Sequence, residues 1–429
     1  MLYLLITLTV LVAINMPIGF AIGIAGAVYF LTSGAIPFPI TIQRVVAQTQ
    51  SIAFLAVPFF IFAGHLMNHT GITHRLLRFA SLLTRGMHGG LAQMNVVLST
   101  MMGGISGSAV ADSSMEARVL GPTMIERGYS RGYTAGITCL SSLITATIPP
   151  SLGLILFGFV GEVSIGRLFV AGIVPGILMM CALMLTVSWT SRRKKFDPPD
   201  PLAGPITLRE FLAELKDSIW ALLFPLILIA GIRFGLFTPS EAGAFAVVYA
   251  LLIGGFVYKE LTWGKFKEAL WESVVDNGAI IIIIALSGIF GYALSLENVT
   301  GAVGGFLVAL TTDPQLMLIL IMGFLFFAGM LVDSNVIVLL LTPILLPIVR
   351  KLGVDPIHFG ILMMTIVTMG VMTPPIGTAV YIVCGILQTP LDEYLKESLP
   401  FFGAVVALVV VLIFLPDVVT FLPNLVYGR

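Results

Sequence analysis

The fold of this chain is decided by two short stretches, TIPPSLG at residues 147–153 and TPPIG at residues 373–377. Each places two consecutive prolines inside an apolar segment, where proline cannot donate a helical hydrogen bond and main-chain carbonyls are left free. Non-helical backbone is tolerated at membrane depth only where protein or water surrounds it. The two stretches therefore predict two discontinuous helices, at about 132–160 and 357–388, with their breaks inside the protein.

A second pair of stretches precedes the two breaks. Residues 112–122 and 333–343 both begin with Asp-Ser and end with proline ten positions later. When the two aspartates are aligned, the spacing to the following Pro-Pro differs by only four residues, which a loop would absorb. We expect an internal repeat with a helical hairpin in each copy, at about 90–127 and 315–349.

The composition is that of an integral membrane protein. Hydrophobic residues make up 58% of the 429 residues and charged residues only 10%, whereas soluble domains carry about 25% charged residues. The net charge of zero argues against nucleic acid as a partner and leaves the lipid bilayer as the expected surroundings. Apolar runs long enough to cross a membrane lie at 2–31, 51–69, 165–189, 218–236, 242–257, 273–296 and 400–422.

The run at residues 2–31 lacks a basic n-region and a small-residue cleavage site, so we expect it to be the first membrane helix. A polar, proline-containing linker at 191–217 divides the chain into a first half, 1–190, and a second half, 218–429. The linker carries a run of four basic residues from Arg192, which predicts a cytoplasmic position.

Basic residues near Arg85 and Arg127 bracket the first hairpin, so both of its ends are expected in the cytoplasm and the hairpin is re-entrant. Five predicted crossings separate the two copies, and an odd number places the copies in opposite orientations. The N-terminus is then cytoplasmic and the C-terminus periplasmic.

Inverted repeats with interrupted helices are typical of secondary transporters, whose sites lie where the repeats meet. Hydroxyls and freed carbonyls suit a small monovalent cation, and we expect at least two sodium sites. The candidate cation ligands are Ser108, Asp112, Thr145, Thr147 and Pro149 in the first copy, and Asp333, Ser334, Thr373, Pro374 and Gly377 in the second.

The hairpin tips supply helix N-termini, which bind anions through unpaired N–H groups and the positive end of the helix dipole. A small organic anion is therefore the expected substrate. The candidate substrate-binding residues are Ser106, Ser108, Ser113, Ser114, Ser334, Asn335 and Thr378.

Structural interpretations remain open for several of these residues. The Pro-Pro pairs could be plain kinks, and Asp112 and Asp333 could be ordinary helix N-caps. Glu116 and Arg118 could pair with each other or reach an aqueous vestibule. Four histidines could suggest a metal site, but they are interpreted as residues at the ends of loops: His65, His69, His74 and His88.

Three stretches resemble the large membrane subunit of tripartite ATP-independent periplasmic (TRAP) transporters, in the ion-transporter superfamily: GISGSAVAD at 104–112, GLFTPSEA at 235–242 and MTPPIG at 372–377. Within 235–242, Thr238 to Glu241 also predicts a helix capping box with proline at the first helical position. Related sodium–dicarboxylate carriers have Ser-Asn-Thr at their hairpin tips. This sequence differs by having Val336 after Ser334-Asn335 in the second copy, and Ser113-Ser114 in place of Ser-Asn in the first copy.

The resemblance implies a polytopic, elevator-type transporter in which two re-entrant hairpins and two discontinuous helices slide against a scaffold. It also implies sodium as the coupling ion, a bacterial inner-membrane location, and two partners: a small four-helix membrane subunit and a periplasmic substrate-binding protein. The expected substrate is sialic acid or a C4-dicarboxylate, with sialic acid preferred.

Two other classes of function are considered. One is a single-component sodium or proton symporter of organic anions that needs no binding protein. The other is an intramembrane enzyme using Asp112 and Asp333, which the absence of H-E-x-x-H and G-x-S-x-G motifs disfavours.

Overall fold

A computed structural model of the protein describes residues 2–14, 16–33, 37, 39–50, 52–198 and 206–428. Within these ranges every regular element is a helix, so the predicted all-α fold class is confirmed. The middle of the predicted linker, residues 199–205, lies outside the described residues.

The helices before the linker run in this order: α1 (Leu2–Ala13), α2 (Ile18–Ser33), α3 (Pro39–Thr49), η1 (Ile52–Leu55), α4 (Ala56–His69), α5 (Ile72–Thr84), α6 (Gly90–Gly103), α7 (Ala109–Val119), α8 (Gly121–Glu126), α9 (Arg131–Thr147), α10 (Leu152–Val160) and α11 (Ile165–Lys194). Those after it are α12 (Leu208–Arg233), α13 (Pro239–Leu252), η2 (Ile253–Val257), α14 (Trp263–Leu296), α15 (Val299–Leu310), α16 (Pro314–Leu331), α17 (Ser334–Lys351), α18 (Pro356–Val371), α19 (Thr378–Leu387), α20 (Leu391–Phe414) and α21 (Pro416–Tyr427).

The two halves repeat each other with a constant offset of 225 positions. The offset relates the first residues of α7 and α17 (109 to 334), the first residues of α9 and α18 (131 to 356), and the first prolines of two cis Pro-Pro bonds (149 to 374). The predicted internal repeat is therefore present in the fold. It spans the hairpin, the broken helix and the long helix that follows, α11 or α20.

The same offset corrects the alignment made from the sequence. It pairs Ser108 with Asp333, because these two residues are the N-caps of α7 and α17. Asp112 is paired with Ile337, so aligning Asp112 with Asp333 was wrong by four positions. Serine and aspartate cap helices about equally well, and a matching aspartate is therefore a poor marker of the helix start.

The two copies are inverted. Between the hairpins, the described residues contain the bent pair α9–α10, the short helix α15 of 12 residues, and four helices long and apolar enough to cross a membrane: α11, α12, α13 with η2, and α14. This odd number of spans places the second copy opposite to the first, as the sequence predicted.

Three predicted segments have different boundaries in the structure. The run at 2–31 is not one helix, because the chain breaks before Pro17 and forms α1 and α2. The run at 400–422 is divided at Pro416, which begins α21. Both ends of the predicted linker are helical, since α11 continues to Lys194 and α12 starts at Leu208 behind a capping box formed by Thr207.

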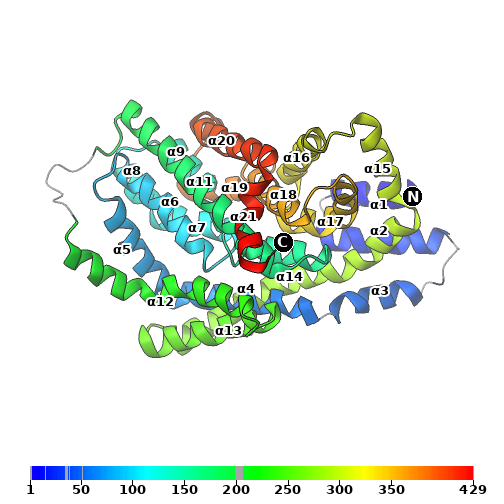
Figure 1. Ribbon diagram of the computed structural model, residues 1–429, viewed down its shortest axis with the longest axis horizontal. Coiled ribbons are helices and arrows are strands. Elements are labelled where there is room, and N and C mark those ends of the chain that lie inside the picture. The colour runs from blue at the N-terminus through cyan, green and yellow to red at the C-terminus, as the bar shows by residue number, and fades with distance from the viewer. Residues whose placement is uncertain are drawn as a thin grey trace.

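Two groups of helices are important for the site (Figure 1). One, the scaffold layer, consists of α2, α3, α4, α12, α13 and α14, which pack side by side. The other, the hairpin core, consists of α6–α7, α16–α17, α9–α10 and α18–α19. In this group α9 packs against α6, α7 and α18, and α18 packs against α16 and α17. In Figure 1 the scaffold helices α12, α13, α4 and α3 extend along the lower edge, with the hairpin core above them.

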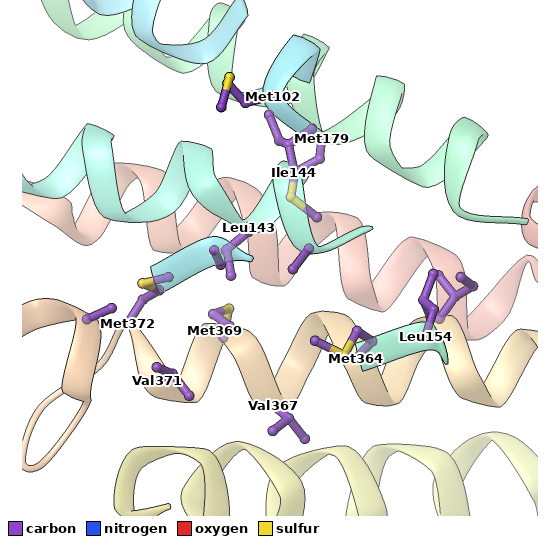
Figure 2. Packing of buried hydrophobic residues seen from close by; sticks show 14 of the residues in the cluster. Met102, Leu143, Ile144, Leu154, Met179, Met364, Val367, Met369, Val371 and Met372 are labelled. Atoms are coloured by element: carbon purple, nitrogen blue, oxygen red, sulfur yellow. The ribbon is translucent and has the colours of Figure 1, made fainter. Parts of the chain in front are cut away.

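The two broken helices pack on each other through buried apolar side chains (Figure 2). Leu154 of α10 lies beside Met364 of α18 in that view. A Cβ atom added at Gly153 would come within 2.1 Å of the Met364 sulfur, so the methionine packs directly against the Gly153 backbone. The flexible methionine fills the irregular space between the helices, and the hairpin core is held together by this apolar packing.

The inversion predicts opposite accessibility for equivalent positions of the two copies. Glu126 and Lys351 are related by the repeat offset, and both are exposed at the end of a hairpin arm. We expect Glu126→Cys, in a cysteine-free background, to react with a membrane-impermeant maleimide only from the cytoplasm, and Lys351→Cys only from the periplasm. Reaction of both variants from the same side of inside-out and right-side-out vesicles would contradict the inverted topology.

Candidate substrate and cation site

The tip of the first hairpin contacts the break in the first discontinuous helix. Gly107 lies in this tip with φ +61°, and its carbonyl accepts a hydrogen bond from the Leu152 N–H at 3.4 Å. A Cβ atom at Gly107 would come 2.1 Å from the Pro150 carbonyl oxygen. Glycine is required here both by the left-handed backbone and by the distance, so the tip and the break fit together as one unit.

A buried group of oxygen atoms lies behind this tip. The Thr145 hydroxyl is 2.6 Å from Asp112 Oδ2 and 2.8 Å from the Ser99 carbonyl oxygen, and one hydroxyl proton can serve only one of them. Asp112 Oδ1 is buried and has no hydrogen-bond partner in the described part of the chain. The donor set fits a small hard cation, and the structure brings the predicted ligands Asp112 and Thr145 together.

Glu116 lies one helical turn beyond Asp112 and belongs to the same group. It is fully buried, accepts a hydrogen bond from the Ser99 hydroxyl at 2.9 Å, and has a second carboxylate oxygen without a partner among the described residues. Of the two alternatives left open by the sequence, pairing of Glu116 with Arg118 is wrong, because residues two apart point to different sides of a helix and Arg118 is exposed. The i, i+4 spacing from Asp112 is the sequence signal that could have placed Glu116 here.

The aspartate of the second hairpin has a different role. Asp333 Oδ1 accepts the Asn335 N–H at 2.9 Å and caps α17, so the N-cap interpretation is confirmed for this residue. The same interpretation is wrong for Asp112, because the cap of α7 is Ser108, which accepts the Ala111 N–H at 3.4 Å.

Carbonyl oxygens converge at the second break. A Cβ atom at Gly377 would come within 2.5 Å of the Thr373 carbonyl oxygen and 2.6 Å of the Val371 carbonyl oxygen. Both carbonyl oxygens thus lie against the Gly377 backbone, where a side chain has no room, and main-chain oxygens are ligands that a small hard cation accepts. Pro374 is half-buried beside them, whereas Pro149 is buried at the first break.

Two predicted hydroxyl ligands bond to their own helices. Thr147 donates to the Leu143 carbonyl at 2.9 Å, and Thr373 donates to the Met369 carbonyl at 2.7 Å. A hydroxyl that donates in this way keeps lone pairs that can face a cation. The hydrogen bonds therefore fix the orientation of both side chains without excluding them as ligands.

Both hairpin tips open onto one cavity of 460 Å³ between the hairpin core and the scaffold layer. Of the predicted substrate-binding residues, Ser113 alone does not line it, since its side chain is buried and bonded to the Val110 carbonyl. The others all line the cavity: Ser106, Ser108, Ser114, Ser334, Asn335 and Thr378. A larger cavity of 1030 Å³, near Arg44 and Tyr292, contains no predicted site residue.

The scaffold side of the 460 Å³ cavity carries three polar residues that the sequence did not assign to the site, His65, Asn68 and Asp276. His65 and His69 were both expected at loop ends. His69 is the last residue of α4, whereas His65 lies one turn inside the helix, and both contact carboxylates of α14. Partners more than 200 positions apart are not visible in a single sequence. No group of three or more metal-ligating side chains occurs among the described residues, so these histidines form no such cluster.

The family described as "Tripartite ATP-independent periplasmic transporter, DctM component" matches residues 5–418. The chain belongs to this family. It is the large membrane component of a TRAP system, a multi-pass transport protein and not an enzyme. The family name implies a tripartite system with further components.

Three curated relatives cover nearly the whole chain. A 2,3-diketo-L-gulonate TRAP large permease of Escherichia coli is 33% identical over 95% of both chains, and a sialic acid TRAP large permease of Vibrio cholerae is 32% identical over 96% of both. A C4-dicarboxylate TRAP large permease of Pseudomonas aeruginosa is 30% identical over 94% of both. The crystal structure of the Alcanivorax borkumensis YdaH transporter matches 87% of both chains with a TM-score of 0.64 at 14% identity, which shows a shared fold.

The fit between tip and break predicts a specific effect of Gly107→Ala. The left-handed backbone alone should cost about 1–2 kcal/mol for a residue with a Cβ atom, and the clash with Pro150 adds to this. We expect a lower melting temperature of the purified protein in detergent. Gly86→Ala is the matched control, because Gly86 lies in open space; an equal effect of both substitutions would contradict the proposed fit.

Proposed function

We propose that this chain carries a small carboxylate into the cell together with sodium, by movement of the hairpin core against the scaffold layer. The observation that supports this most directly is the cavity into which both hairpin tips open, at the boundary between the two groups of helices. An elevator-type movement would carry the tips and their ligands as one body, because the broken helices of the two copies pack on each other.

Recognition of an anion in this cavity rests on helix N-termini. α7, α17 and α19 begin at residues that line it, and no lysine or arginine does so among the described residues. Helix N-termini stabilise a nearby negative charge by about 0.3–1 kcal/mol each, and by up to about 2 kcal/mol in partly buried geometry. Several N-termini together can therefore hold one carboxylate without an ion pair.

Sodium is the proposed co-substrate, with one site in each copy. The first would use Asp112, Thr145 and the Ser99 carbonyl, and the second the carbonyls that converge at Gly377. Asp112 is a negative charge behind the tip that receives the anion. A cation at Asp112 offsets the repulsion between the Asp112 carboxylate and the anionic substrate. This is a physical reason for the cation and the substrate to bind together.

The carboxylate class is supported by the substrates after which the relatives are named, which include sialic acid, C4-dicarboxylates and 2,3-diketo-L-gulonate. By the same family relationship, the proposed partners are a small four-helix membrane subunit and a periplasmic substrate-binding protein. We place the assembly in the bacterial inner membrane, with the N-terminus of this chain in the cytoplasm and its C-terminus in the periplasm.

The first sodium site predicts the behaviour of Asp112→Asn. Removal of the only charged ligand should raise the sodium concentration for half-maximal uptake at least about tenfold, because hydrogen bonds and ion contacts to charged groups are worth about 1.5–3 kcal/mol. Uptake would be measured in proteoliposomes holding this chain with its two partners, using labelled sialic acid, 2,3-diketogulonate and succinate. Ser113→Ala is the neighbouring control, since Ser113 lies outside the cavity, and an unchanged sodium dependence in Asp112→Asn would remove the proposed site.

The same proteoliposomes distinguish a tripartite assembly from the alternative hypothesis of a single-component symporter. We expect the chain alone to give little uptake of free substrate, and addition of the small subunit and the loaded binding protein to restore it. Full sodium-driven uptake by the chain alone would favour the single-component alternative.

A further inference from the structure

The scaffold wall of the cavity carries a ladder of histidines and carboxylates. On α14, Glu268, Glu272 and Asp276 are four residues apart and share one face. They meet His65 and His69 of α4, which are also four residues apart. Glu272 Oε2 lies 3.1 Å from His69 Nε2 and 3.1 Å from His65 Nδ1, and Asp276 Oδ2 lies 2.8 Å from His65 Nε2.

The contacts of His65 fix the position of Asp276. Both ring nitrogens of His65 face carboxylate oxygens, whereas a neutral imidazole has only one N–H to donate. Both contacts are satisfied together when the ring carries two protons. In that form His65 holds Glu272 and Asp276 on either side, and Asp276 has a defined orientation at the cavity edge.

The wall stays negative even with both histidines charged, because three carboxylates face two imidazolium rings. Asp276 is the carboxylate that lines the cavity. Its side chain is 56% exposed, and its Oδ1 has no partner within the described residues. Asn68, one turn from His65 on the cavity side of α4, is exposed and its amide is likewise without a described partner.

The cavity therefore has two unlike sides. Helix N-termini of the hairpins, which attract an anion, lie on one side, and the free oxygen of Asp276 and the amide of Asn68 lie on the other. The volume of 460 Å³ is within the range of about 300–1,000 Å³ found for small-molecule sites. A ligand with one carboxylate can place it at the N-termini and direct its remaining groups at the scaffold wall.

We propose that Asp276, together with Asn68, selects a monocarboxylate with hydroxyl or amide donors at its far end over a dicarboxylate. The proposal rests on the transport function above and names the substrate class within it. Hydroxyl or amide N–H groups would donate to Asp276 Oδ1 and to the Asn68 side-chain carbonyl. A second carboxylate would face Asp276 as a like charge, so selectivity comes from rejection as well as from attraction.

The test compares ligand binding by the full-length chain in nanodiscs containing sodium. The ligands are two hydroxylated monocarboxylates, sialic acid and 2,3-diketogulonate, and two C4-dicarboxylates, succinate and fumarate. Dissociation constants would be obtained from the ligand-induced shift of the melting temperature. We expect the unmodified chain to bind the hydroxylated monocarboxylates more tightly.

In Asp276→Asn the preference for hydroxylated monocarboxylates should fall about tenfold, the size expected when one like-charge contact at the edge of an aqueous cavity is removed. Glu268→Gln is the matched control, because it removes a charge two turns away on the same face of α14, from a residue that neither lines the cavity nor contacts His65. Its preference should be unchanged. Asn68→Asp adds a carboxylate to the wall and should increase the preference, which provides a second variant if Asp276→Asn does not fold.

The outcomes separate the two proposals. Tight binding of dicarboxylates by the unmodified chain overturns the selectivity proposal, and so does a preference unchanged in both Asp276→Asn and Asn68→Asp. Both of these results leave the transport function standing. If none of the four ligands shifts the melting temperature of the unmodified chain, the selectivity proposal fails. The carboxylate transport function is contradicted only if the assembly of this chain with its two partners also takes up none of the four ligands in proteoliposomes with a sodium gradient.

Discussion

The whole arrangement depends on one constraint: a backbone interrupted at membrane depth must have its polar groups satisfied by protein. At the first break this is done by Ser151, whose hydroxyl donates to the Ala146 carbonyl at 2.5 Å, and by the Gly107 carbonyl, which accepts the Leu152 N–H. The hairpin tip is therefore part of the structure of the break. Once the two are joined, the oxygen atoms that remain unpaired, above all Asp112 Oδ1, are the ones available to a ligand.

The features that could be predicted from the sequence are those set by local chemistry. A single proline can stay inside a helix, as Pro343 and Pro347 do in α17, but a Pro-Pro pair removes two consecutive donors and interrupts it. The two breaks were therefore located to within a few residues, and the count of spans predicted the inverted topology. Helix starts were harder, because Ser108 and Asp333 perform the same capping with different side chains. Hydropathy alone also joined α1 to α2 and misplaced the last crossing, although Pro17 and Pro416 marked both interruptions.

The scaffold side of the candidate site could not be predicted, and the reason is physical. Asp276 and His65 are 211 positions apart and meet only because α4 and α14 pack side by side. The i, i+4 spacing on each helix is visible in the sequence, but it is equally typical of a solvated face. Glu116 was suspected because a charge in a membrane segment is costly, but the sequence did not show its partner Ser99, which lies in α6 and is brought beside it where α7 packs against α6.

In the proposed mechanism the buried carboxylates also give a reason why the transporter binds the anion better once a cation is bound. Asp112 and Glu116 are fully or almost fully buried, each has one unpaired oxygen, and no basic side chain forms an ion pair with either in the described residues. Burying an uncompensated ion costs several kcal/mol even after the protein relaxes. A cation bound at Asp112 would remove much of this cost. It would also leave the hairpin tips with a more positive potential toward the cavity, so that cation binding favours the anion before any movement of the hairpin core occurs.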